Sequence, residues 1–291
     1  MDPDGGEASF AYRHTEQAAS QILKTTLLTI ALSACHGFER ERTASALGMN
    51  LSRQGPLLTK TASHIAPKKK KKTIYLTFDD GPNKGTRKMM HIVEEERVQV
   101  TLFIIGEHVY GSREQTASFD SVLQSRFFEI ANHSYSHAFH NNYAKFYEVP
   151  DSALNDFKRC ADSLHLTAKI IRTPGRNIWR TETVSSTDIK KSTAAADSFY
   201  MNGYKEIGWD LEWQFDDKLK LKKTSDEMVN EVDSLFAHNK MKTPGHLVIL
   251  AHDQVYADAD DSTELHRFIS KLKAKDEYDF ETVSNYPGIK K

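Results

Sequence analysis

The stretch 73-TIYLTFDDGPN-83 is the most informative part of the sequence, because an apolar run of strand type ends there in two adjacent aspartates. Residues 73–78 are mainly β-branched and aromatic, and the Gly-Pro pair that follows favours a turn, so a strand is predicted to stop at Asp79 and Asp80. Taken alone, such a pair is equally compatible with an ordinary surface turn. Two neighbouring like charges therefore need partners elsewhere in the chain before they indicate chemistry.

Beyond this stretch, short β-rich runs alternate with amphipathic segments. Strands are predicted at 73–78, 98–105, 127–132, 169–173, 204–210, 246–252 and 279–284. Helices are predicted at 84–97, 113–126, 151–165, 185–201, 224–239 and 261–275. Repeated alternation of this kind indicates a parallel sheet, and we expect an α/β fold, namely a distorted, incomplete (β/α) barrel of seven or eight strands. Functional side chains should then follow the carboxyl ends of strands.

The composition describes a mostly globular chain without a dominant charge. Its 291 residues include 39 Lys+Arg and 40 Asp+Glu, so no overall field attracts nucleic acid, and no nucleic-acid partner is expected. The 39% of hydrophobic residues is enough to bury a sizeable core. Cys35 and Cys160 lie far apart in unlike contexts, which argues against a disulfide framework, and Cys160 is interpreted as a buried small apolar residue.

The N-terminal region differs in composition and periodicity from the rest of the sequence. Residues 1–21 are polar and aperiodic, which predicts a disordered extension. The run 22-ILKTTLLTIALSAC-35 is too short to span a bilayer but suits a signal peptide, and its end resembles a bacterial lipobox in which Cys35 is acylated. A buried amphipathic helix is the alternative. Because the run begins far from Met1, one hypothesis is that translation starts near Leu23.

Three regions are predicted from these textures: a signal and lipobox region at 1–35, a polar tether at 36–72 and a folded domain at 73–287. The tether ends in 68-KKKKK-72, which is most simply a solvated run, with contact to anionic headgroups as the alternative. If Cys35 is lipidated, the protein is exported in a bacterium and held at the cell envelope. This lipid anchor would be its only membrane contact.

A pair of histidines is a candidate partner for the two aspartates. In 129-EIANHSYSH-137, His133 and His137 follow the third predicted strand four residues apart, a spacing that brings both imidazoles to one face of a helix or tight turn. Metal-binding imidazoles commonly take a carboxylate as third ligand and leave a position open for water. H-x-x-x-H alone is weak evidence. Combined with a strand-end Asp-Asp, it is considerably stronger evidence of a metal site.

Two further predicted strands end in residues suited to chemistry. The fourth ends in 172-RTPGR-176 and the sixth in 250-LAHD-253, which place Arg172 and His252 at strand termini. TFDDGP, H-S-x-S-H, R-x-P-G and L-x-H-D occur in the order and spacing of the polysaccharide deacetylase family, the NodB homology domain of carbohydrate esterase family 4. The resemblance covers roughly residues 72–287, and 101-TLFIIGEHV-109 and 279-DFETVS-284 also resemble family strands.

This resemblance implies a distorted barrel and metal-assisted hydrolysis of N-acetyl groups on hexosamine polymers. Asp80, His133 and His137 would hold one divalent metal, with Zn²⁺ favoured and Co²⁺, Ni²⁺ or Mn²⁺ also compatible with this ligand set. The metal would make water a stronger nucleophile near neutral pH. The remaining residues would move protons and bind the sugar.

Asp79 would be the general base, oriented by Arg172, and His252 would protonate the departing amine. In the family, a segment after the fifth strand supplies an aromatic wall and an aspartate that tunes the acid histidine. Here that segment is 208-GWDLEWQF-215, which departs from the usual pattern. Asp210 and Glu212 both remain candidates for the tuning carboxylate.

Aromatic faces stack well on sugar rings, so Trp209 and Trp213 are candidate substrate-binding residues, although each is equally compatible with a place in the core. Tyr135, between the paired histidines, and Pro174, in the turn after Arg172, are two further substrate-binding candidates.

The expected activity is removal of acetyl groups from N-acetylhexosamine units of a polysaccharide, with peptidoglycan, chitin-like and exopolysaccharide substrates all open. An O-acetyl xylan or polysaccharide esterase is the alternative within the same chemistry. A non-catalytic glycan-binding lipoprotein is the alternative of another class, and the presence of both Asp79 and His252 argues against it. The acetylated polysaccharide is the expected partner of a monomeric protein.

Overall fold

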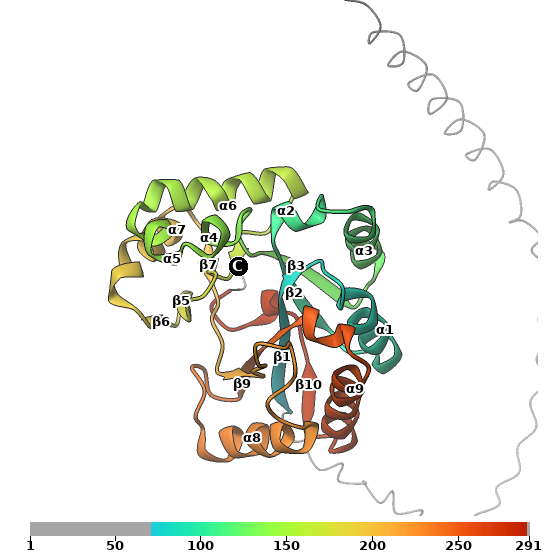
Figure 1. Ribbon diagram of the computed structural model, residues 1–291. Helices are drawn as coiled ribbons and strands as arrows, with labels where there is room; N and C mark the ends of the chain where they lie inside the picture. Colours follow the sequence, from blue (N-terminus) through green and yellow to red (C-terminus); the bar gives the residue numbers. More distant parts are fainter. Residues whose placement is uncertain (1–70, 290–291) are drawn as a thin grey trace, which may run out of the picture. The chain divides into compact units, whose positions relative to one another are not determined.

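A curled, mainly parallel sheet forms the centre of the computed structural model, which describes residues 71–289 (Figure 1). The predicted signal segment, Cys35 and the tether as far as Lys70 lie outside the described residues. The parallel strands, in spatial order, are β7 (Lys205–Glu206), β4 (Ile170–Ile171), β3 (Phe128–Asn132), β2 (Val100–Ile104), β1 (Lys72–Gly81), β9 (His246–His252) and β8 (Leu211–Glu212). A short strand, β10 (Tyr278–Phe280), pairs in parallel with the first residues of β1.

The sheet stays open, as the expected incomplete barrel requires. One edge is β8, and beyond β7 the other edge continues into the antiparallel strands β5 (Ile178–Arg180) and β6 (Ser185–Thr187). This hairpin corrects one sequence prediction, because residues 185–201 were expected to be helical throughout. The helix of this region begins only at Thr193, after β6 and a 3₁₀ turn at Lys190–Ser192.

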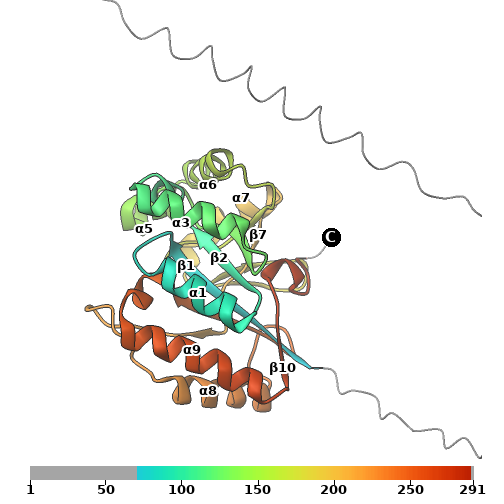
Figure 2. The same cartoon turned by 90° about the vertical axis from the view of Figure 1, so that its right-hand side faces the viewer.

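Helices cover the outer face of the sheet. The longer ones are α1 (Thr86–Glu96), α3 (Arg113–Gln124), α6 (Pro150–Leu164), α7 (Thr193–Met201), α8 (Ser225–His238) and α9 (Ala259–Ala274). The shorter ones are α2 (Gly106–Val109), α4 (His137–Asn141), α5 (Tyr143–Glu148) and two more 3₁₀ turns, Asp253–Ala257 and Val283–Asn285. Figure 2 shows α1 and α9 side by side on this outer layer, and α8 beside α9.

The side chains of β1 alternate between the two faces of the sheet, so Asp79 does not point into the same core as the apolar residues before it. Ile74, Leu76 and Phe78 belong to the large core beneath α1, α8 and α9, while Tyr75 packs in a second cluster on the inner side of the curl. Because side chains alternate between the two faces of a strand, Asp79 follows Tyr75 into the interior of the half-barrel.

Within the described residues, no helix is both long and apolar enough to cross a bilayer.

Candidate active site

Four strands of the sheet deliver polar side chains to the inner side of the half-barrel at their carboxyl ends. Asp79 on β1 lies directly beside His252 on β9 in the parallel register. His133 follows β3 and Arg172 follows β4. Their apolar predecessors Ala131, Ile170 and Val248 belong to the inner cluster, so the period of two that buries these residues also directs the polar ones inward.

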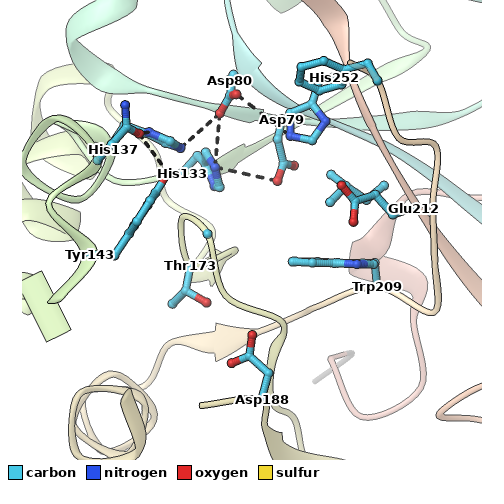
Figure 3. A pocket seen from close by; sticks show the side chains of 14 residues that line it. Asp79, Asp80, His133, His137, Tyr143, Thr173, Asp188, Trp209, Glu212 and His252 are labelled. Carbon is cyan, nitrogen blue, oxygen red and sulfur yellow. Dashed lines mark hydrogen bonds and ion pairs between the residues drawn. The ribbon is translucent and has the colours of Figure 1, made fainter. Parts of the chain in front are cut away.

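Asp80, His133 and His137 form the candidate metal site (Figure 3). One ligand atom from each lies within 4.8 Å of the others. Asp80 Oδ1 is 3.4 Å from Nε2 of His133 and 3.3 Å from Nε2 of His137. This oxygen is buried and has no hydrogen-bond donor among the described residues. A carboxylate oxygen and two imidazole nitrogens facing a common space suit a divalent cation, so the residues present fit the expected metal.

Both imidazoles are oriented through their other nitrogen. Nδ1 of His133 contacts the carbonyl oxygen of Arg172 at 2.9 Å, and Nδ1 of His137 contacts Oδ1 of Asn141 at 2.5 Å. Since each acceptor requires a protonated Nδ1, both Nε2 atoms are left with a free lone pair toward Asp80. The backbone of Asp80 is itself unusual, with a positive φ of 72° that turns its side chain away from the path of the strand.

Burial and neighbouring charges shift the pKa values of the three candidate metal ligands in different directions. Burial alone would raise the pKa of Asp80, but the surrounding imidazoles hold it well below its usual range. Burial, together with the neighbouring His133, lowers the pKa of His137. Burial also acts to lower the pKa of His133, but Asp79 and Asp80 outweigh this effect and raise it.

Arg172 holds Asp79, the aspartate that is not a candidate metal ligand. Its side chain is 1% exposed, and Nη1 donates to Asp79 Oδ1 at 2.9 Å and to Thr77 Oγ1 at 2.6 Å. The remaining donors reach the carbonyl oxygens of Ile207 and Gly208, and the guanidinium lies 4.2 Å from the ring centre of Phe103. Asp79 is therefore an ion-paired carboxylate with one oxygen fixed. Its other oxygen, Oδ2, is 3.7 Å from Nε2 of His133.

A cleft of about 490 Å³ opens over these groups. Its lining residues are Asp79, Asp80, His133, His137, Asn141, Tyr143, Thr173, Gly175, Asp188, Trp209, Glu212, Phe215, Leu250 and His252. His252 packs edge-on against Phe215, with ring centres 5.1 Å apart, and its Nε2 is 4.0 Å from Asp80 Oδ2. Figure 3 shows Trp209 and Glu212 on the side of the cleft opposite His137.

The structure places Asp210 and Glu212, the two candidate carboxylates of segment 208–215, in different environments. Glu212 pairs with Leu250 in the register of β8 with β9 and lines the cleft, whereas Asp210 accepts hydrogen bonds from the amides of Lys242 and Val248. Burial raises the pKa of Asp210 to about 6. No hydrogen bond or ion pair links either carboxylate to His252 within residues 71–289, and Nδ1 of His252 is buried without a partner there.

Three of the four substrate-binding candidates lie outside the cleft. Trp213 is fully buried against Phe268 and donates to the carbonyl oxygen of Lys223. Tyr135 lies beneath the guanidinium of Arg159, and Pro174 accepts a hydrogen bond from Tyr147. Trp209 alone of this group lines the cleft.

Sequence reasoning missed several lining residues, among them Asn141, Tyr143, Asp188 and Phe215. Asn141 and Tyr143 come soon after the histidine pair, but their segment has neither strand character nor a clear helical period. Asp188 lies in the hairpin region that was expected to be helical. Phe215 was quoted within the aromatic segment 208–215, and its position next to the acid candidate was the only signal available for it.

Comparison with known proteins agrees with this geometry. Residues 66–187 match the sequence profile of the polysaccharide deacetylase family. The matched segment covers 122 of the 291 residues and includes Asp79, Asp80, both paired histidines and Arg172. This match, together with relatives named as deacetylases, supports a hydrolase of the deacetylase class.

Among curated relatives, the chitin disaccharide deacetylase of Vibrio alginolyticus is 22% identical over 310 residues, covering 74% of this chain and 71% of that protein. The chitooligosaccharide deacetylase of Rhizobium leguminosarum bv. phaseoli is 36% identical over 66 residues, which are 22% of this chain and 28% of that enzyme.

Among solved structures, the catalytic domain of a peptidoglycan N-acetylglucosamine deacetylase from Eubacterium rectale superposes with a TM-score of 0.54 at 21% identity, covering 78% of this chain and 94% of that one. A Streptococcus mutans CE4 esterase gives the same TM-score at 20% identity, with 73% and 86% covered. At these identities, the likeness establishes a shared fold.

Proposed function

We propose that this protein is a metal-dependent hydrolase that removes acetyl groups from N-acetylhexosamine units of a polysaccharide. The observation that carries the proposal is the buried Asp80 Oδ1, which faces two imidazole Nε2 atoms and has no donor of its own among the described residues. The three groups would hold one divalent ion, with Zn²⁺ our first choice. When bound, the ion would lower the pKa of water and draw negative charge from the substrate carbonyl.

Asp79 receives the proton of the attacking water in this proposal. Its Oδ1 is fixed by Arg172, so Oδ2 is the oxygen that remains to accept a proton beside the metal-binding space. The water oxygen bonds to the acetyl carbon, and the carbonyl oxygen takes on negative charge. Backbone N–H groups of the turn after Arg172, where Thr173 and Gly175 line the cleft, would stabilise this charge.

His252 completes the reaction by protonating the nitrogen as the carbon–nitrogen bond breaks, which releases acetate and the amine. Its ring lies on the opposite side of Asp80 from His137, at the end of β9, and borders the cleft. Phe215 fixes the ring from one side. We assign Glu212, and not Asp210, to the region where the leaving sugar binds, because Glu212 lines the cleft whereas the Asp210 oxygens accept backbone amides.

Trp209 would provide an apolar surface for the sugar ring. The residues that line the cleft do not distinguish between peptidoglycan, chitin-like chains and exopolysaccharide, so all three are candidate substrates. O-Deacetylation of a xylan or another polysaccharide uses the same metal and base and depends less on His252.

We further propose that the protein acts as a monomer at the bacterial cell envelope, tethered through an acylated Cys35. This proposal rests on the lipobox-like sequence alone. Mass spectrometry of the protein purified from membranes tests it. Diacylglycerol on Cys35 is the expected result, and an unmodified Cys35 in an intact chain would contradict the proposed anchor.

Acetate release from a panel of N-acetylated glycans, with and without chelator, tests the proposed activity. Chelation should abolish release and added Zn²⁺ should restore it. Asp79→Asn should reduce turnover by roughly 10²–10⁴-fold, because an amide cannot accept the proton. The matched control Asp217→Asn alters an exposed carboxylate that does not line the cleft and should retain wild-type turnover. Equal turnover by wild type and Asp79→Asn would remove the proposed base.

A further inference from the structure

The turn that carries His137 has an uncommon backbone. From His137 to Asn141, five consecutive residues have positive φ, between 47° and 69°, and none of them is glycine. Left-handed helical backbone costs roughly 1–2 kcal/mol per residue when a side chain is present. Strain of this kind tends to be retained where geometry serves function.

The left-handed turn brings its first and last side chains together. Nδ1 of His137 lies 2.5 Å from Oδ1 of Asn141, and the amide oxygen can only accept, so Nδ1 carries the proton. Nε2 then presents its lone pair toward Asp80 Oδ1 at 3.3 Å. Asparagine is also among the residues that adopt the left-handed region most readily, which suits the final position of this turn.

Tyr143 holds the same amide oxygen from the other side. Its hydroxyl donates to Asn141 Oδ1 at 2.9 Å, and its ring packs edge-on against His137 with ring centres 6.0 Å apart. The ring lies over Gly175, where an added Cβ would approach Tyr143 Cε1 to 2.7 Å.

The two imidazoles thus differ in how they are oriented. His133 relies on a backbone carbonyl, which no substitution removes, whereas His137 relies on a side chain. We propose that Asn141 is a positioning residue that keeps His137 Nε2 directed into the metal-binding space, with Tyr143 steadying its amide oxygen. The inference rests on the proposed metal site.

Cobalt binding by the full chain tests this role without relying on turnover. Co²⁺ affinity is measured by titration calorimetry, and the ligand geometry by the visible absorption of the Co²⁺ complex. Asn141→Ala should weaken binding by about 10–100-fold and alter the spectrum, as loss of an outer hydrogen-bond partner of a ligand does. Asn141→Asp keeps an acceptor and should stay within about threefold of wild type. Asn142→Ala removes the same atoms one residue later, from an exposed side chain that makes no capping bond, and should match wild type.

Several results would overturn the positioning role of Asn141. Asn141→Ala binding Co²⁺ within twofold of wild type, or Asn141→Asp binding as weakly as Asn141→Ala, would overturn the assignment. If circular dichroism shows that Asn141→Ala is unfolded, Tyr143→Phe takes its place, since it deletes only the hydroxyl and should weaken binding by about 2–10-fold. Unchanged affinity there would overturn the assignment as well. A wild-type protein that binds no Co²⁺ would overturn the proposed metal-dependent function itself, whereas wild-type binding with indifferent variants would overturn only the role of Asn141.

Discussion

Replacing Arg172 by lysine should destabilise the domain while keeping a positive charge beside Asp79. The guanidinium makes four side-chain hydrogen bonds, to Asp79, Thr77 and the carbonyl oxygens of Ile207 and Gly208. A lysine ammonium placed near Asp79 cannot also reach both carbonyls, because it lacks the planar fork of the guanidinium. Loss of about three bonds at roughly 1 kcal/mol each predicts a decrease in unfolding free energy of about 3 kcal/mol.

Urea unfolding at pH 7, followed by tryptophan fluorescence, measures this change. Arg176→Lys is the matched control on the same turn, because Arg176 is partly exposed and its bonds go to Ser192 and Gly175. That variant should lose less than about 1 kcal/mol. Acetate release by folded Arg172→Lys should also fall, since Asp79 would no longer be held in one position. A loss of stability no larger than that of Arg176→Lys would refute the view that the buried fork organises the site.

Three further results are expected. His252→Ala should reduce N-acetyl hydrolysis by roughly 10²–10⁴-fold but affect 4-nitrophenyl acetate much less, because a nitrophenolate leaves without a proton; equal losses on both substrates would contradict the acid role. Gly175→Ala should lower stability and acetate release more than Gly245→Ala, since both have positive φ but only the first meets the Tyr143 ring; equal effects in calorimetric melting and turnover would count against that contact. The pKa of Asp210 is raised to about 6 from 3.8, so its protonated form favours the folded state. Its contribution is complete below about pH 4 and is lost as pH rises through about 6, so wild-type stability should fall by on the order of 2 kcal/mol over this range relative to Asp210→Asn. Parallel pH profiles in urea unfolding would disprove this.

Much of the fold follows from local patterns. Each of the seven predicted strands corresponds to a strand of the sheet, and the helices agree apart from the segment 185–201, where β6 and a 3₁₀ turn precede α7. The strands that escaped prediction, β5, β6 and β8, have only two or three residues each. Such segments are too short for a period of two to be recognised, and pairing with neighbouring strands determines their conformation.

By itself, the sequence determined which residue types stand at the strand ends, because strand termination and the spacing of Asp79, His133, Arg172 and His252 are properties of contiguous segments. Only the tertiary structure decided which neighbours in 208–215 meet the cleft. The parallel register of β8 with β9 places Glu212 beside Leu250 and directs Trp213 outward against α9.

The left-handed turn that joins His137 to Asn141 was equally hidden from sequence, because a positive φ in residues other than glycine leaves no mark in a hydrophobic pattern. Side-chain direction depends on pairing partners distant in the chain and on backbone angles that these partners stabilise. A single linear sequence pattern contains neither.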